Sequence, residues 1–167
     1  MIRSTEWHPL IVHFPLALGV TAALALSAAH LAREPRRTAL LASVGSVNLA
    51  LAALGAVVAI ATGLVALLGV TLEPAARLAV AVHIKWAMLT AVMLLLLAVW
   101  RSVGQALEAR PSRLFVLLLW LMTACLAVTG YRGGLNVYRY GVGVERAGAV
   151  EAGAQSAGSV SRPPGGR

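Results

Sequence analysis

Charged residues are scarce in this chain, and aspartate is absent. Only 12% of its 167 residues are charged, whereas 59% are hydrophobic and the mean hydropathy is +0.82. A soluble domain of this length has too small a core to bury so much apolar surface. The composition therefore predicts an integral membrane protein, with lipid around most of its surface.

Other absences exclude whole classes of function. The single cysteine, Cys125, excludes an internal disulfide and a thiolate metal cluster. The formal charge of +8 does not indicate nucleic acid, because no aromatic residues alternate with the arginines to stack on bases. No acidic residue falls within an apolar run, which argues against a transporter or channel. No nucleophile or carboxylate accompanies the histidines, so a hydrolytic enzyme is not expected.

Four apolar runs are each long enough to cross a bilayer, which takes about 20 residues. They cover about residues 9–31, 38–70, 78–100 and 114–131. This pattern predicts an all-α fold, an integral membrane four-helix bundle with short loops and both termini on the same side. We expect the transmembrane domain to span residues 1–144, with a Gly/Tyr-rich motif at 130–144, and residues 145–167 to form a disordered tail.

The arginines of the short loops predict the orientation of the bundle. Cytoplasmic loops of membrane proteins are enriched in Lys and Arg. The first and third loops contain most of the loop arginines, whereas the second loop has one and so does the N-terminus. Both termini are therefore expected on the outer, periplasmic side. The arginines of the first and third loops are Arg33, Arg36, Arg37, Arg101, Arg110 and Arg113.

The start of the first run, His8-Pro9-Leu10-Ile11-Val12-His13-Phe14-Pro15, concentrates polar residues and prolines. Pro9 is predicted to open the helix, because a proline at the first helical position loses no hydrogen bond. Pro15 falls inside the helix and should kink its first turns.

The second run carries small residues four apart, at Gly55, Ala59 and Gly63. Such residues let a neighbouring helix backbone approach closely. Asn48 is the one amide of this run, and we expect it to form an interhelical hydrogen bond.

Two histidines are predicted to face each other near the outer end of the bundle. His13 and His83 each lie about 6 Å inside the predicted start of their helix, on alternate spans. Four-helix bundles hold haem between such histidines, so His13 and His83 are candidate axial ligands of haem b. A zinc or copper ion on His8, His13 and His83 is the alternative. A third hypothesis is that the histidines only tie helices together.

Other polar residues lie near these histidines in the sequence pattern. Lys85 is predicted to point away from His83 and to reach the interface, or else to pair with a haem propionate. Tyr138 is either part of an aromatic belt or a cover for the site. His30, near the opposite face, is expected to reach the lipid headgroups.

Two sequence stretches resemble the signatures of a bacterial family of predicted four-helix membrane proteins, catalogued as a domain of unknown function. They are HPLIVHFPLAL at the N-terminus and GG-x-x-VY-x-x-GVGV at 133–144, and the resemblance covers residues 8–144. The family's histidines correspond to His8, His13 and His83. Its C-terminal motif corresponds to Gly133, Gly134, Val137, Tyr138, Gly141 and Gly143.

The chain departs from the family's pattern at three places. The family often has an apolar residue at Asn136 and a histidine at Tyr140. It also tends to have an acidic residue soon after the glycine that corresponds to Gly63, where this chain has Leu64, Val65 and Ala66. An acid-dependent proton or metal role is not expected at that position.

The resemblance implies a module that occurs alone or joined to c-type cytochrome domains. A redox setting in the bacterial inner membrane follows as an expectation. The first hypothesis is therefore an electron-transfer module that exchanges electrons with a periplasmic cytochrome or copper protein. The alternatives are a metal-binding membrane protein and a non-catalytic subunit of a respiratory complex or of a homo-oligomer.

Overall fold

The computed structural model describes the backbone of residues 4–104 and 106–144, and side chains from Trp7 onward. The predicted tail at 145–167 lies outside the described residues. Five helices form the described part: α1 (Ser4–Ile11), α2 (His13–Leu31), α3 (Pro35–Leu68), α4 (Pro74–Gly104) and α5 (Arg113–Tyr138). The prediction of an all-α fold is confirmed for these residues.

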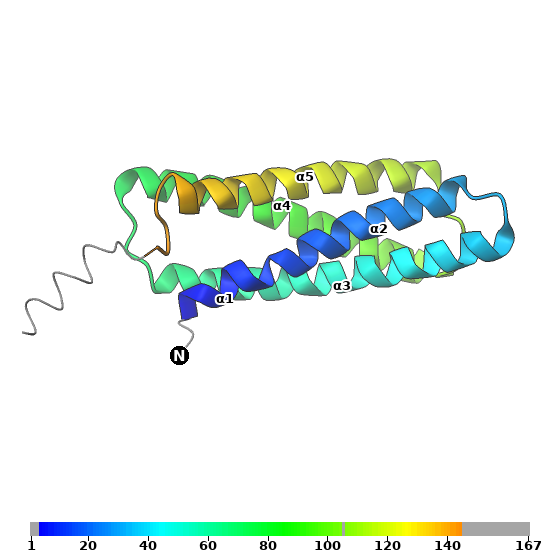
Figure 1. Cartoon of the computed structure of the whole chain (residues 1–167), viewed down its shortest axis with the longest axis horizontal. Helices are drawn as coiled ribbons and strands as arrows, with labels where there is room; N and C mark the ends of the chain where they lie inside the picture. Colours follow the sequence, from blue (N-terminus) through cyan, green and yellow to red (C-terminus); the bar gives the residue numbers. More distant parts are fainter. Residues whose placement is uncertain (1–3, 105, 145–167) are drawn as a thin grey trace, which may run out of the picture.

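The helices form a four-helix bundle whose first span is made of α1 and α2 together (Figure 1). α2 packs beside α3 and α5, and α4 also packs beside α3 and α5, so neighbouring spans alternate in direction. Four stretches are long and apolar enough to cross a membrane: Trp7–Leu31, Pro35–Leu68, Pro74–Gly104 and Arg113–Tyr138. The fold is thus the predicted transmembrane bundle with short connections.

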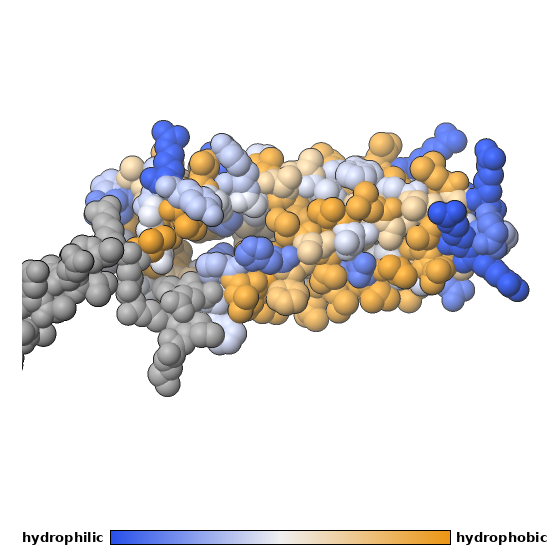
Figure 2. Space-filling model, in the orientation of Figure 1, coloured by the Kyte–Doolittle hydropathy of each residue, from blue (hydrophilic) through white to orange (hydrophobic). Residues whose placement is uncertain are grey.

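The two ends of the bundle differ in their residues. We call one the arginine end, which contains the α2–α3 and α4–α5 connections with Arg33, Arg36, Arg37, Arg101 and Arg110. The other is the histidine end, where α1, the α3–α4 connection and the end of α5 meet around His8 and His83 (Figure 1). Apolar residues cover the visible middle of the bundle, and strongly hydrophilic side chains gather at the arginine end (Figure 2).

The helices are longer than the predicted apolar runs. α4 begins at Pro74 rather than near residue 78, because proline suits the first helical position. α5 continues to Tyr138 rather than ending near residue 131. The 34 residues of α3 span roughly 51 Å at 1.5 Å per residue, more than the hydrocarbon core of about 30 Å. The bundle therefore reaches through the headgroup layers.

The first span bends between α1 and α2, as Pro15 predicts. Pro15 has no N–H for the Ile11 carbonyl, and its ring crowds that group. The next bond, from Leu16 N–H to Val12 O, is long at 3.4 Å. Pro9 lies inside α1, which corrects its prediction as the helix start. The bend lets Pro15 pack onto α3, where a Cβ added at Gly55 would lie 3.2 Å from Pro15 Cδ.

Small residues set the close approach of α2 and α3. A Cβ added at Gly45 would lie 2.6 Å from Leu26 Cγ, and the alanines Ala52 and Ala56 are buried in the same interface. Of the predicted small residues, Gly55 packs against Pro15, Ala59 is buried and Gly63 packs against His8, which confirms their role in close helix packing. Asn48 also donates to Thr21 Oγ1 at 3.3 Å, which confirms the expected interhelical hydrogen bond.

Candidate functional site

His8 lies on α1 against the last turns of α3. Its Nδ1 is 3.0 Å from the carbonyl oxygen of Ala59 and 3.4 Å from Thr62 Oγ1. A Cβ added at Gly63 would lie 3.0 Å from His8 Cε1, so only glycine lets the ring lie this close to α3. The Ala59 carbonyl can only accept, so Nδ1 is the donor of this hydrogen bond, and Nε2 carries the lone pair when the ring is neutral. Nε2 makes no hydrogen bond to any described residue.

His83 lies on α4 and packs against α5. Its Nδ1 is buried and has no hydrogen-bond partner among the described residues. A Cβ added at Gly133 would lie 3.2 Å from His83 Cε1, which repeats the arrangement of His8 and Gly63. The backbone of Thr129 also lies beside the ring. A buried polar atom without a partner costs free energy, so a water, a ligand or the nearby Thr129 backbone would stabilise this nitrogen by bonding to it.

The structure brings His8 together with His83. His8 lies on α1 and His83 on α4, both at the histidine end. Both are half-buried, and each rests on a glycine of the helix that it faces. We call His8 and His83 the histidine pair. Gly63 and Gly133 are the glycines against which their rings lie. These four residues join α1, α3, α4 and α5 at one level of the bundle.

The depth of the histidine pair follows from the length of α5. Gly133 lies on α5 about 20 residues, or roughly 30 Å, from the first residue Arg113. That distance equals the thickness of the bilayer hydrocarbon core. The pair therefore lies where the hydrocarbon core meets the headgroups of the histidine end.

The other predicted site residues lie apart from this pair. His13 is exposed on the outside of α2 and makes no hydrogen bond to a described residue. Lys85 is exposed on α4, as its spacing from His83 predicts. Tyr138 is 92% exposed at the end of α5 and does not cover the histidines. His8 rather than His13 therefore lies inside the bundle, because five residues of helix place His13 about 140° around the axis from His8.

The predicted three-histidine set is not assembled. Among residues 4–104 and 106–144, no three His, Cys, Asp or Glu side chains form a group that could hold a metal ion. The exposed position of His13 accounts for this, since it lies about 140° around the helix from His8.

The glycine motif plays two different roles. Gly133 and Gly134 lie inside α5, beyond the predicted end of the fourth apolar run near residue 131. Gly141 and Gly143 have φ of 62° and 77°, which glycine adopts without strain. They let the chain fold back after α5, so that Val142 N–H donates to the Asn136 carbonyl at 2.9 Å.

Sequence patterns missed two polar side chains inside the bundle, Arg101 and Asn136, which are 1% and 7% exposed. Arg101 donates from Nε to Ser46 Oγ at 2.8 Å and from Nη2 to the Leu107 and Ala109 carbonyls at 2.8 and 2.6 Å. The sequence pattern places Arg101 in the third loop because it follows an apolar run. Its place one turn past Leu97 on a buried face was the signal available.

His30 also differs from its prediction. Rather than reaching the headgroups, its Nδ1 donates to the Pro111 carbonyl at 2.8 Å. Arg110 donates to the His30 carbonyl from the same loop at 2.8 Å. His30 is therefore a structural residue of the arginine end.

Comparison with known proteins agrees with this architecture. The model of a family described as "Predicted membrane protein (DUF2231)" matches residues 5–146. No curated protein and no solved structure matches the chain.

Proposed function

Because the chain belongs to this family of predicted membrane proteins, we propose that it is an integral membrane redox module in which His8 and His83 hold a b-type haem. The observation that carries the proposal is that two half-buried imidazoles, one against α3 and one against α5, occur at the same end of the bundle, with His8 Nε2 and His83 Nδ1 making no hydrogen bond to a described residue. A bound haem supplies one-electron transfer. His8 takes the place that His13 has in the prediction from the sequence.

Three features of the residues fit an imidazole-ligated cofactor. Metal-ligating histidines commonly donate their second ring nitrogen to a backbone carbonyl, as His8 does to Ala59. For His83, the backbone of Thr129 beside the ring is the corresponding acceptor. Gly63 and Gly133 leave no side chain between the rings and the helices behind them.

The surroundings suit electron exchange at the membrane surface. The histidine end carries exposed polar groups, among them Tyr138 and Arg139, which a soluble partner can contact. The arginine end holds more loop arginines than the histidine end, which supports a cytoplasmic arginine end and periplasmic termini. The partner would then be a periplasmic cytochrome or copper protein.

A second candidate function rests on one observation. His8 already bonds α1 to α3 through Ala59 and Thr62. If this contact is its whole role, the chain is a non-catalytic membrane subunit whose histidines stabilise the bundle.

The test is an oxidised-minus-reduced visible spectrum of protein purified in detergent from haem-replete cells, with metal analysis of the same sample. We expect an α-band in the wild type that is lost in His8→Ala and His83→Ala. His13→Ala is the matched control and should keep the band, because His13 is exposed.

Three other results would contradict the proposal. A band lost only with His13→Ala and His83→Ala would restore the pairing predicted from the sequence. Stoichiometric copper or zinc without a band would assign the two histidines to a metal ion. A wild type without haem or metal, with variants that lose only stability, would establish the structural subunit.

A further inference from the structure

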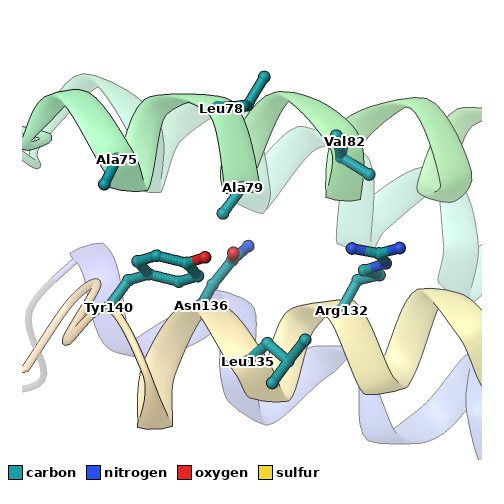
Figure 3. Close-up of a pocket in the computed structure, with 8 residues that line it drawn as sticks. All are labelled: Ala75, Leu78, Ala79, Val82, Arg132, Leu135, Asn136 and Tyr140. Carbon is teal, nitrogen blue, oxygen red and sulfur yellow. The ribbon is translucent and has the colours of Figure 1, made fainter.

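A cleft of about 180 Å³ opens between the start of α4 and the end of α5, at the histidine end (Figure 3). One wall is apolar and comes from Ala75, Leu78 and Ala79 of α4. The other wall carries the polar groups of Arg132, Asn136 and Tyr140. The cleft does not include His8 or His83 in its lining, so it is separate from the histidine pair.

The three polar residues form one row. Arg132 and Asn136 lie four residues apart on α5 and so share a face of that helix. Tyr140 follows the helix end, and the fold-back stabilised by Val142 N–H and the Asn136 carbonyl holds it over the cleft. Figure 3 shows the guanidinium of Arg132 and the amide of Asn136 directed toward α4, with the hydroxyl of Tyr140 directed toward Asn136.

Two of these side chains lack partners in the described part of the chain. Asn136 is 7% exposed, and its Oδ1 is buried with no hydrogen-bond donor. Arg132 is exposed and forms no ion pair or hydrogen bond with the described residues. An acceptor that needs a donor and a cation that needs an anion therefore lie one helical turn apart.

The position and size of the cleft limit its ligand. Asn136 lies on α5 one turn beyond Gly133, hence within the headgroup layer. Leu78 at the rim is 72% exposed, so the cleft is open to lipid. The cleft volume corresponds to about six waters at roughly 30 Å³ each, which suits one small polar group. Arg132 disfavours a ligand with a net positive charge, and the polar row disfavours an apolar molecule.

We propose that this cleft binds the headgroup of a phospholipid that carries both a phosphate and a hydrogen-bond donor. The phosphate accepts from Arg132, and a glycerol hydroxyl or an ethanolamine ammonium donates to Asn136 Oδ1. Tyr140 covers the headgroup, and the acyl chains lie along the apolar surface beside Leu78. This site does not depend on the proposed haem.

The proposal is tested by native mass spectrometry of the full chain, delipidated in detergent and titrated with phosphatidylglycerol, phosphatidylethanolamine or phosphatidylcholine. We expect the first two to bind at least tenfold more tightly than phosphatidylcholine, which has the phosphate but no donor. Inorganic phosphate at millimolar concentration should not displace phosphatidylglycerol. Equal binding of all three lipids, or displacement by free phosphate, would overturn the proposal.

Variants assign the effect to the cleft. Arg132→Gln should weaken phosphatidylglycerol binding at least tenfold, whereas Arg139→Gln, an exposed cation outside the cleft, should leave it unchanged. Asn136→Leu should abolish the preference for phosphatidylglycerol and phosphatidylethanolamine over phosphatidylcholine, because it removes the acceptor for the headgroup donor. It should also raise the thermal midpoint of the lipid-free protein, because the buried oxygen without a partner is gone.

Two outcomes of these variants overturn the site. One is an Asn136→Leu protein that keeps the lipid preference. The other is equal loss of binding in Arg132→Gln and Arg139→Gln, which would show only general attraction of anionic lipid to cations. Arg132 is exposed, so its variant tests the proposal even if Asn136→Leu does not fold.

Discussion

The two ends of the bundle satisfy their buried polar groups very differently. At the arginine end, Arg101 bonds Ser46 and two loop carbonyls, and His30 bonds the Pro111 carbonyl. At the histidine end, His83 Nδ1 and Asn136 Oδ1 are buried without partners among the described residues. At the arginine end these buried polar groups are hydrogen-bonded within the protein. At the histidine end, two buried polar atoms remain available to a ligand.

The difference follows from what surrounds each group. Arg101 lies beside the α4–α5 connection, whose carbonyls turn inward and serve as acceptors. His83 and Asn136 lie on helices, where neighbouring backbone groups already bond within their own helix. A polar side chain between two helices therefore needs a second side chain, water or ligand, and the interior of a membrane bundle has few of these.

The largest expected effect is at the arginine end. Arg101→Met removes the donor from Ser46 and from two loop carbonyls, and should lower the free energy of unfolding by about 3–5 kcal/mol. Thermal or SDS unfolding in detergent measures it. Arg113→Gln, an exposed arginine of the same end, is the control and should change little. Equal effects of the two variants would show that Arg101 is not a structural residue.

The second prediction compares a satisfied histidine with an unsatisfied one. His30→Leu leaves the Pro111 carbonyl without its donor and should cost about 1–2 kcal/mol. His83→Leu should leave the cofactor-free protein unchanged or more stable, because it removes a buried nitrogen without a partner. Both are measured by thermal unfolding of protein from haem-depleted cells. A similar loss of stability in both variants would show that His83 stabilises the bundle as much as His30 does, which contradicts the difference between the two ends.

The smallest effect separates two adjacent glycines of α5. Gly134 has no neighbouring atom within 4 Å of an added Cβ, so Gly134→Ala should stabilise the helix by about 0.5–1 kcal/mol. Gly133→Ala places its Cβ against His83. It should therefore give no such stabilisation, and it should reduce cofactor occupancy because it displaces the ring. Unfolding and visible spectra of both variants measure the difference. Identical behaviour of the two would show that the ring does not need Gly133.

The positions of the spans could be predicted from the sequence, but most contacts of the candidate site could not. His83 and the meeting of α1, α3, α4 and α5 at one end follow from four apolar runs of alternating direction. The choice of His8 over His13 does not, because both histidines precede Pro15 and both lie near the predicted interface. Helical spacing places the two about 140° apart, and only the contact of His8 with Ala59 shows which of them faces the bundle.

Hydropathy and loop charge alone establish a transmembrane four-helix bundle with an arginine-rich end, because crossing lipid demands long apolar helices and places cations in the loops. The tertiary structure decides which polar groups meet. Arg101 finds acceptors, whereas His83 Nδ1 and Asn136 Oδ1 find none in the described chain. The physical reason is that a hydrogen bond depends on the rotation and bend of helices to within an ångström, which the periodicity of a sequence does not specify.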